Sequence, residues 1–367
     1  MAYLLSAGTS IPRCHVNQEQ AAGFAREMFK DSFKDIDRLL ASFKNGEIES
    51  RQFVMPLEWY KDAKSFEEKN QAYIEMAVKH SAEAVTNCLS DRRFLKSEVP
   101  FETIEAIFFV SSTGISTPSI EARLMNILPF SRQTKRIPLW GLGCAGGASG
   151  IARAFEYCTA FPKAHVLVVA AELCSLTFQK DDKSKSNLIG TSLFGDGIAA
   201  VLMCGKEADT SCSHFPVLPE VLGSQSSTLK DSEDVMGWEI NNSGFQVVFS
   251  RDIPSLIRTR LKKDVEAFLD GQNAGLADIQ VFLAHPGGKK VLDAYIDSLG
   301  FSEEHLACSR RILARHGNMS SATIMYVIKD CFVNVTPEPG KHGLLGALGP
   351  GFSSELLFMK WTEKESE

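Results

Sequence analysis

Hydrophobic positions along the chain fall into two patterns, which predict two kinds of element. Short runs that are almost wholly apolar and rich in β-branched residues predict strands buried on both faces. The longest of these runs are Ile104–Val110, Val166–Ala171 and Ile198–Met203, and shorter ones are Tyr3–Ala7, Val281–Ala284 and Leu356–Trp361. We therefore expect at least one sheet with a buried centre.

Longer stretches place apolar residues three or four positions apart and predict helices. These stretches are Asn17–Phe43, Ser65–Leu89, Ala148–Ala160, Ile253–Leu269, Lys289–Leu299 and Ser320–Phe332, with a further helix opened by Pro118. A glycine-rich segment, Gly343–Gly351, predicts a loop. Because the predicted strands alternate with helices, we expect an α/β fold with mixed or parallel sheets.

One pattern occurs twice along the chain. Residues 107–114 and 281–288 are each an apolar strand followed by small or polar residues and a glycine. From Ser112 to Cys144 is 32 residues, from His285 to Asn318 is 33, and a small-residue cluster starts a helix at both downstream points. This spacing favours two duplicated halves, 1–207 and 208–367, that meet near a polar connection. The alternative is that any α/β protein repeats strand–helix units of about 30 residues.

The sharpest local signal is the glycine-flanked cysteine in Leu142-Gly143-Cys144-Ala145-Gly146-Gly147. A cysteine at a strand-to-helix turn lies where free backbone N–H groups and the helix dipole lower the pKa of a thiol. Flanking glycines allow a sharp turn and the close approach of a substrate. A small residue packed in a tight turn is the simpler interpretation of this motif alone.

His285 and Asn318 gain significance through the repeated spacing. His285 directly follows a predicted buried strand, and Asn318 could be only a helix N-cap. If the halves are duplicated, Cys144 and Asn318 are symmetry mates and His285 emerges beside them. The three residues could then form a hydrolase site, or a condensing site in which His285 and Asn318 donate hydrogen bonds to a thioester oxygen that becomes an enolate.

Composition and charge exclude several other classes of protein. The net charge is −6 and long basic runs are missing, so a general nucleic-acid binder is not expected. The start of the chain lacks a basic signal region, and the uncharged stretch 137–152 is too short for a stable membrane insertion. Nine cysteines without a CxxC spacing predict reduced thiols in a cytoplasmic protein and no zinc site.

Several motifs together resemble one family. Residues 140–150 around Cys144, Thr191-Ser192-Leu193-Phe194-Gly195-Asp196-Gly197, Ala284-His285-Pro286-Gly287-Gly288, Gly317-Asn318-Met319-Ser320-Ser321 and Gly349-Pro350-Gly351 occur in this order over nearly the whole chain. This set resembles the signature of the type III polyketide synthases, the chalcone and stilbene synthase family. Within that family the chain is most similar to bacterial alkylpyrone synthases.

The resemblance implies a fold, an assembly and a reaction. The fold would be the thiolase fold, with five layers (αβαβα) built from the two halves, and the assembly a homodimer. Cys144 would carry the acyl chain, while His285 and Asn318 promote decarboxylation of malonyl-CoA. The substrates would be acyl-CoA and malonyl-CoA, without a metal or redox cofactor.

The resemblance also assigns residues around the substrate. Phe194 would be a gatekeeper and Thr177 would line the cavity, whereas Thr117 would reach into the neighbouring subunit's site. The remaining implied substrate-binding residues are Val247, Ser320, Gly349, Pro350 and Gly351.

Two departures from the plant members stand out. The three basic residues that hold the coenzyme A phosphates there correspond here to Arg38, Ala41 and Asn45, so Arg38, Lys44 and Arg51 are the candidate phosphate ligands. A cavity phenylalanine of the plant enzymes corresponds to Val247, which favours an aliphatic medium- or long-chain starter and alkylpyrone products. A fatty-acid ketosynthase of the acyl-carrier-protein type and a Cys-His-Asn hydrolase are the alternative functions.

Overall fold

The computed structural model describes residues 1–250, 252–335 and 337–364. Its strands are β1 (Ala2–Ser10), β2 (Cys14–Asn17), β3 (Ser50–Phe53), β4 (Ile104–Ser111), β5 (Lys135–Trp140), β6 (His165–Leu173), β7 (Asp196–Gly205), β8 (Val217–Thr228), β9 (Met236–Asn241), β10 (Gly244–Phe249), β11 (Ile279–Ala284), β12 (His342–Gly349) and β13 (Ser353–Glu363). Its α-helices are α1 (Gln18–Phe29), α2 (Ile36–Asn45), α3 (Phe66–Ser90), α4 (Ile120–Leu124), α5 (Gly146–Ala160), α6 (Lys185–Leu193), α7 (Ile253–Leu256), α8 (Lys262–Asp270), α9 (Lys289–Leu299), α10 (Ala307–His316) and α11 (Ala322–Asn334).

The main sheet has nine strands in the order β11-β12-β13-β8-β1-β7-β6-β4-β5. In the N-terminal half, β4 runs parallel to β5 and β6, and β7 pairs antiparallel with β6 and β1. In the C-terminal half, β11 and β12 are parallel, and β13 pairs antiparallel with β12 and β8. The halves join between β1 and β8 at Ala2–Val221 and Tyr3–Glu220. This short junction lets each half form its own sheet surface.

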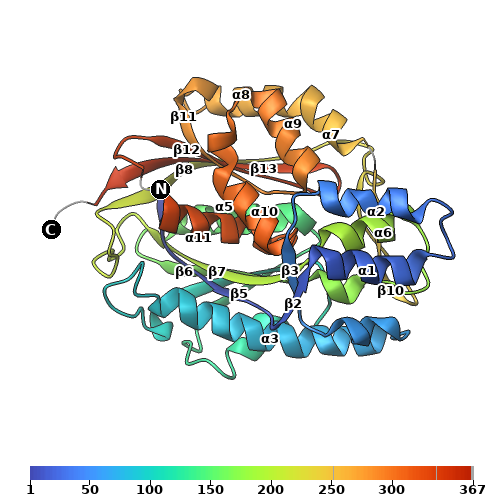
Figure 1. The fold of residues 1–367 in the computed structure, drawn as a ribbon. Helices are drawn as coiled ribbons and strands as arrows, with labels where there is room; N and C mark the ends of the chain where they lie inside the picture. Colours follow the sequence, from blue (N-terminus) through green and yellow to red (C-terminus); the bar gives the residue numbers. More distant parts are fainter. Residues whose placement is uncertain (251, 336, 365–367) are drawn as a thin grey trace.

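The helices lie in three layers around the two halves of the sheet (Figure 1). α3 covers the outer face of the N-terminal half, α8 and α9 cover the outer face of the C-terminal half, and α5 and α11 lie between them. The five-layered αβαβα arrangement that we expected for a thiolase fold is confirmed.

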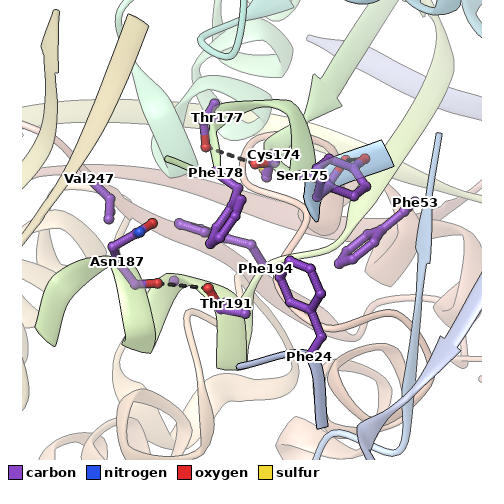
Figure 2. A pocket seen from close by; sticks show the side chains of 12 residues that line it. Phe24, Phe53, Cys174, Ser175, Thr177, Phe178, Asn187, Thr191, Phe194 and Val247 are labelled. Atoms are coloured by element: carbon purple, nitrogen blue, oxygen red, sulfur yellow. Dashed lines mark hydrogen bonds between the residues drawn. The ribbon is translucent and has the colours of Figure 1, made fainter. Parts of the chain in front are cut away.

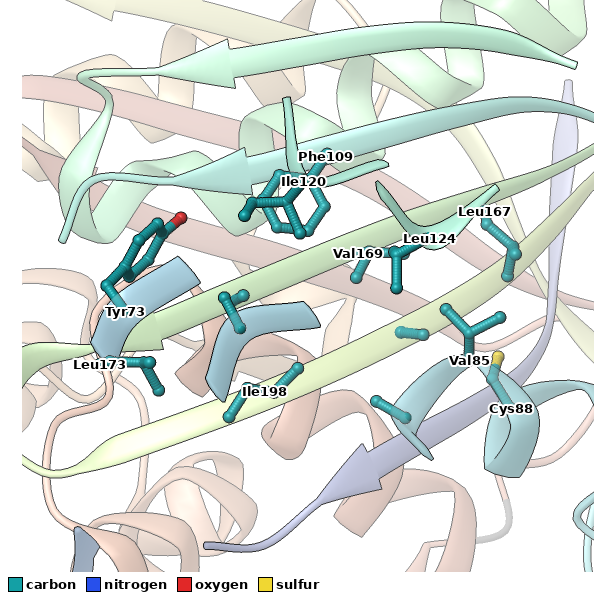
Figure 3. Packing of buried hydrophobic residues seen from close by; sticks show 14 of the residues in the cluster. Tyr73, Val85, Cys88, Phe109, Ile120, Leu124, Leu167, Val169, Leu173 and Ile198 are labelled. Atoms are coloured by element: carbon teal, nitrogen blue, oxygen red, sulfur yellow. The ribbon is translucent and has the colours of Figure 1, made fainter. Parts of the chain in front are cut away.

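Burial on both faces explains why the central strands are continuous apolar runs. Every residue of β7 is buried, as is every residue of β6 after His165. Val85 and Cys88 of α3 belong to the same buried cluster as Phe109 of β4 and Val169 of β6 (Figure 3). Each fully buried aliphatic side chain contributes about 1.5–3 kcal/mol, so this cluster holds α3 firmly on the sheet.

Two of the predicted helices differ from the structure. The stretch Asn17–Phe43 forms two helices, α1 and α2, because residues 30–35, which are mostly polar, are not helical. The stretch Ile253–Leu269 is helical, but a π-helical turn, Ile257–Leu261, separates α7 from α8. The apolar spacing continues through both interruptions, so the pattern alone did not reveal them.

The predicted loop Gly343–Gly351 is wrong, because most of it is strand β12. Its glycines make room for large neighbours rather than for a turn. A Cβ at Gly343 would lie 2.6 Å from the Trp361 ring, and one at Gly346 would lie 3.2 Å from the Phe282 ring. Strands β2, β3, β8 and β9 and helices α6 and α10 were not predicted, since they carry weaker apolar patterns.

None of the helices in the described part of the chain combines the length and the apolar character that a membrane crossing requires.

Candidate active site

Cys144 lies in a 3-10 helical turn, Gly143–Ala145, between β5 and α5. Gly143 has φ +48°, and a Cβ at this position would lie 2.6 Å from Cδ of Pro350. Its backbone N–H donates to Oγ of Ser112 (2.9 Å) at the end of β4. Glycine at position 143 is therefore required both by its backbone conformation and by its neighbour, and it places Cys144 at the N-terminus of α5.

The predicted Gly349-Pro350-Gly351 segment packs against this turn. Gly349 ends β12, and a Cβ there would lie 2.6 Å both from Cβ of Ala145 and from the carbonyl oxygen of Leu142. Gly351 has φ +65° in the connection to β13. The segment thus packs on the two residues that flank Cys144, Gly143 and Ala145.

Asn318 lies in the connection between α10 and α11, and its amide faces Cys144. Its Nδ2 lies 3.9 Å from Sγ of Cys144 and donates to the carbonyl oxygen of Gly287 (3.3 Å). Its Oδ1 accepts from the backbone N–H of Ser320 (2.8 Å). Oδ1 also lies 3.9 Å from Sγ of Cys144, so both ends of the amide face the thiol, and Nδ2 in addition faces the segment that follows His285.

The backbone of Asn318 also fixes Phe194. The backbone N–H of Asn318 donates to the carbonyl oxygen of Leu193 (2.9 Å), and the backbone N–H of Gly195 donates to the carbonyl oxygen of Asn318 (3.0 Å). Phe194 therefore lies next to the catalytic candidates although it comes from the other half of the chain.

His285 follows β11 and is buried. Its backbone N–H donates to Gly346 of β12 (2.8 Å), whereas neither ring nitrogen has a hydrogen-bond partner among the described residues. Burial lowers the pKa of His285 to about 3, so the ring is neutral. Buried polar groups in proteins are nearly always paired, and an unpaired imidazole beside Asn318 is poised to bind a ligand.

The thiol of Cys144 is also neutral in this state. Burial raises its pKa to about 11, while hydrogen bonds from Ser320 and Asn318 oppose the rise and the Glu172 carboxylate adds to it. The expectation that the helix N-terminus and His285 favour a thiolate is therefore wrong for the ligand-free site. Burial removes water from the thiolate form of Cys144, and this raises the pKa more than the nearby hydrogen-bond donors lower it.

Glu172, at the end of β6, was missed by the sequence reasoning. It is fully buried and accepts hydrogen bonds from the Ser112 N–H (3.1 Å), Oγ1 of Thr113 (2.8 Å) and Oγ of Ser321 (2.5 Å). Burial raises its pKa to about 7. Glu172 links the end of β4 to the segment that carries Asn318. A charged residue directly after the apolar run Val166–Ala171 was the signal that could have revealed it.

A cavity next to Phe194 contains two more predicted residues, Thr177 and Val247 (Figure 2). Phe194 packs against Trp238 and Phe249, with ring centroids 5.8 and 5.6 Å apart. The rest of the cavity wall comes from α1, β3, α6 and the segments after β6, and it was not predicted from the sequence. These residues are Phe24, Phe53, Tyr60, Cys174, Ser175, Phe178, Asn187, Gly190 and Thr191.

Eight predicted binding residues lie outside this cavity, namely Thr117, Arg38, Lys44, Arg51, Ser320, Gly349, Pro350 and Gly351. Thr117 is exposed in the loop before α4, and Arg38 and Lys44 are exposed on α2. Arg51 is fully buried, and its Nη1 donates to the carbonyl oxygens of Thr191 (3.0 Å) and Phe194 (3.2 Å). The structure therefore contradicts Arg51 as a ligand for coenzyme A phosphates. It supports the Phe194 segment instead.

Within the described ranges, no group of three or more His, Cys, Asp or Glu side chains is arranged to hold a metal ion.

Comparison with known proteins agrees with this geometry. The family model of the N-terminal domain of chalcone and stilbene synthases matches residues 1–207, and that of the C-terminal domain matches residues 220–362. The chain is 64% identical over 361 residues to a Bacillus subtilis protein described as "Putative chalcone synthase", covering 98% of this chain and 99% of the relative. It is 35% identical to a 1,3,6,8-tetrahydroxynaphthalene synthase of Streptomyces peucetius subsp. caesius, covering 86% and 81%.

A solved structure extends the similarity to the whole fold. The crystal structure of 1,3,6,8-tetrahydroxynaphthalene synthase from Streptomyces coelicolor A3(2), a bacterial type III polyketide synthase, superimposes with a TM-score of 0.90 at 27% identity. The match covers 99% of this chain and 100% of that one. Sequence, fold and the surroundings of Cys144 thus agree, and the chain belongs to the chalcone and stilbene synthase family as a type III polyketide synthase.

Proposed function

We propose that this polyketide synthase transfers a medium- or long-chain acyl group from acyl-CoA to Cys144, extends it with malonyl-CoA, and releases alkylpyrones. The observation that carries the proposal is the convergence on one point of the Cys144 thiol, the Asn318 amide at 3.9 Å and the segment after the unpaired His285. Each of the three supplies a different part of the reaction.

The first step is acyl transfer. Cys144 gives its proton to His285, and the sulfur attacks the thioester carbonyl of acyl-CoA. A new C–S bond forms, the bond to coenzyme A breaks, and coenzyme A leaves as a thiol with the proton from His285, which becomes neutral again. Burial disfavours each charge alone, but one proton transfer creates a thiolate and an imidazolium together. Each charge stabilises the other, which makes the buried thiol a nucleophile when the substrate excludes water.

The second step is decarboxylative condensation. Malonyl-CoA loses CO₂, and the electron pair becomes an enolate whose oxygen accepts hydrogen bonds from Asn318 Nδ2 and from the neutral His285 ring. The enolate carbon attacks the Cys144 thioester, a C–C bond forms and the thiolate leaves. Preorganised donors of this kind each contribute roughly 10²–10³ in rate. None of these steps requires a metal or a redox cofactor.

Lactonisation would release the product. Each condensation leaves the longer chain on coenzyme A, and a further acyl transfer reloads it onto Cys144. After two extensions and reloading, the distal enol oxygen of the triketide attacks the Cys144 thioester carbon through a six-membered ring, the C–S bond breaks and Cys144 leaves. This ring closure requires little from the protein beyond a folded chain, so a pyrone is expected wherever another cyclisation is not enforced.

The cavity supports an aliphatic starter. Its wall combines aromatic side chains and Val247 with small polar side chains, and Phe24 and Phe53 lie on the side away from Val247 (Figure 2). Burial of each methylene contributes about 0.8 kcal/mol. Efficiency should therefore rise with acyl length until the cavity is full, and Val247 leaves room for the chain next to Phe194.

Arg38 and Lys44 support a coenzyme A site on α2. Both are exposed, and Glu47, just after α2, pairs with Lys289 at the start of α9 (2.7 Å). α9 follows the His285 segment, so this ion pair holds the end of α2 beside the entrance to the site. The cations can there bind the phosphates of coenzyme A.

A homodimer is supported by the edge of the sheet. β5 is the last strand of the nine, and large apolar side chains are exposed along it and the adjoining loops, including Trp140 (50%), Ile115 (46%) and Ile127 (57%). Pairing of two such edges would cover them. It would also bring Thr117, two residues from Ile115, toward the neighbouring subunit.

Product analysis tests the proposed function. Purified protein is incubated with malonyl-CoA and saturated acyl-CoA of 6 to about 18 carbons, or with coumaroyl-CoA, and products are identified by mass spectrometry. We expect 6-alkyl-4-hydroxy-2-pyrones and a preference for chains of about ten carbons or more. Val247→Phe should shift the preference to shorter starters, with Val333→Phe on the exposed end of α11 as the control. A preference for coumaroyl-CoA, or 1,3,6,8-tetrahydroxynaphthalene from malonyl-CoA alone, would contradict the assignment.

A further inference from the structure

The two helices on either side of Asn318 each carry a buried cysteine. Cys308 lies in the first turn of α10, and Cys331 lies in the last turn of α11. α10 and α11 are antiparallel neighbours joined by the Asn318 segment, and both cysteines belong to the same core cluster. Their side chains interact, and this interaction is the largest influence on the protonation of both thiols. Neither residue takes part in the condensation mechanism.

Arg311 places a positive charge next to one of the two sulfurs. Its Nη2 lies 3.2 Å from Sγ of Cys308. The same guanidinium is held by Asp330, with Nη2 and Nε at 2.5 and 3.0 Å from Oδ2. Asp330 directly precedes Cys331. The ion pair therefore fixes the cation at Cys308 and ties α10 to the turn that carries Cys331.

The two thiols differ in acidity. The thiol of Cys331 lowers the pKa of Cys308, and Arg311 acts in the same direction, whereas burial and Asp330 oppose it. The same interaction raises the pKa of Cys331. Burial is instead the largest cause at Cys88 and Cys158, and it raises the pKa of both thiols. A thiol with thiolate character beside a second, protonated thiol is the arrangement in which oxidation leads to a disulfide.

We propose that Cys308 and Cys331 form an oxidation site for a small hydroperoxide, with Cys308 as the attacking thiol and Cys331 as the resolving one. The Cys308 sulfur attacks one oxygen of hydrogen peroxide, the O–O bond breaks, and Cys308 becomes a sulfenic acid while one water leaves. The Cys331 sulfur then attacks the Cys308 sulfur, a second water leaves, and the S–S bond forms. Two thiols and one peroxide thus give one disulfide and two waters, and an external dithiol reverses the reaction.

The disulfide would connect the outer ends of α10 and α11. The 22 residues between the two cysteines contain the whole Asn318 segment. Such a bond would restrain the helix pair that orients the Asn318 amide, so the oxidation state of this pair is coupled to the position of a catalytic residue. The site is separate from the cavity and from Cys144.

Peptide mapping tests the proposal. The full chain carrying Cys144→Ala, which removes the catalytic thiol as a competing target, is treated with hydrogen peroxide, alkylated and digested. We expect a peptide linked through Cys308 and Cys331 that dithiothreitol removes, formed before any oxidation of Cys88 or Cys158. Equal oxidation of Cys88 and Cys308, or a protein without the linked peptide, would overturn the proposal.

Single variants identify which thiol attacks. In Cys331→Ser, Cys308 should stop at the sulfenic acid and be captured by dimedone, whereas in Cys308→Ser the Cys331 thiol should stay reduced. Arg311→Gln should slow the oxidation of Cys308 several-fold, and Arg315→Gln, at an exposed position of the same helix, should not. Dimedone capture at Cys331 instead of Cys308 would show that the assigned order is wrong.

Discussion

Burial determines the protonation state of the groups around Cys144. The pKa of Cys144 is raised to about 11, that of His285 is lowered to about 3 and that of Glu172 is raised to about 7. In each case the largest cause is loss of water around the charged form. The ligand-free site is therefore largely neutral, and a negative charge that forms there during reaction meets hydrogen-bond donors rather than other anions.

At the residue scale, Asn318 should matter more for decarboxylation than for the reactivity of the thiol. Asn318→Ala removes one of two donors from the enolate oxygen, and we expect malonyl-CoA decarboxylation to fall by roughly 10²–10³. Alkylation of Cys144 by iodoacetamide should change by less than about tenfold, because Asn318 is a minor influence on the thiol pKa. The exposed Asn126→Ala is the control. Equal losses in both assays would contradict separate roles.

Glu172 should make stability depend on pH. An unfolded glutamate ionises near pH 4.5, whereas folded Glu172 keeps its proton until about pH 7. The folded state binds more protons in this window, so the contribution is present below about pH 4.5 and is lost as the pH rises through 7. We expect the stability of the wild type relative to Glu172→Gln to fall by up to about 3 kcal/mol between pH 4.5 and 8.

Thermal or urea unfolding of both proteins at several pH values measures this difference. Asp196, whose pKa burial also raises to about 7, is present in both proteins and cancels in the comparison. A difference in stability that stays constant from pH 4.5 to 8 would show that Glu172 does not titrate in this range.

At the scale of elements, the turn before α5 is held by two separate requirements at Gly143. An alanine there would adopt φ +48° and place its Cβ 2.6 Å from Pro350. Gly300, after α9, has φ +72° with no atom within 4 Å of its ideal Cβ position among the described residues. Gly300→Ala is therefore a matched control, because it places an alanine at a positive φ without a clash between its Cβ and a neighbouring residue.

We expect Gly300→Ala to lower the free energy of unfolding by about 1 kcal/mol and to leave the condensation rate unchanged. Gly143→Ala should lower the free energy of unfolding by at least about 1–3 kcal/mol. It should also remove most of the condensation activity, because Pro350 and the Cys144 turn must move apart. Urea unfolding and product formation measure the two effects. Equal effects of the two substitutions would mean that the contact with Pro350 has no consequence.

At the scale of the whole molecule, the proposed dimer rests on the exposed apolar side chains at the β5 edge. Trp140→Lys places a charge on the proposed interface and should convert a dimer to monomers at micromolar concentration, as measured by sedimentation equilibrium. Ile240→Lys, in the β9–β10 hairpin, replaces a side chain of similar exposure (55%) away from β5 and should leave the dimer intact. A wild-type protein that is monomeric at high concentration would contradict the interface.

The sequence by itself determined the layered α/β architecture, and it predicted Cys144, His285 and Asn318 as the central residues of the site. Strands buried on both faces must be continuous apolar runs, as in β6 and β7, and helices that cover a sheet must carry one apolar stripe. Cys144, His285 and Asn318 could be found because the strand–glycine–helix pattern occurs twice with nearly equal spacing.

Only the tertiary structure decided what depends on contacts between distant segments. It showed that Arg51 is buried against the Phe194 segment, that the glycines of β12 accommodate Trp361 and Phe282, and that Glu172 joins β4 to the Asn318 segment. It also showed that burial raises the pKa of the Cys144 thiol. A local pattern records which face of an element is apolar, but burial and hydrogen-bond partners arise from residues far apart in the chain, so they appear only when the chain is folded.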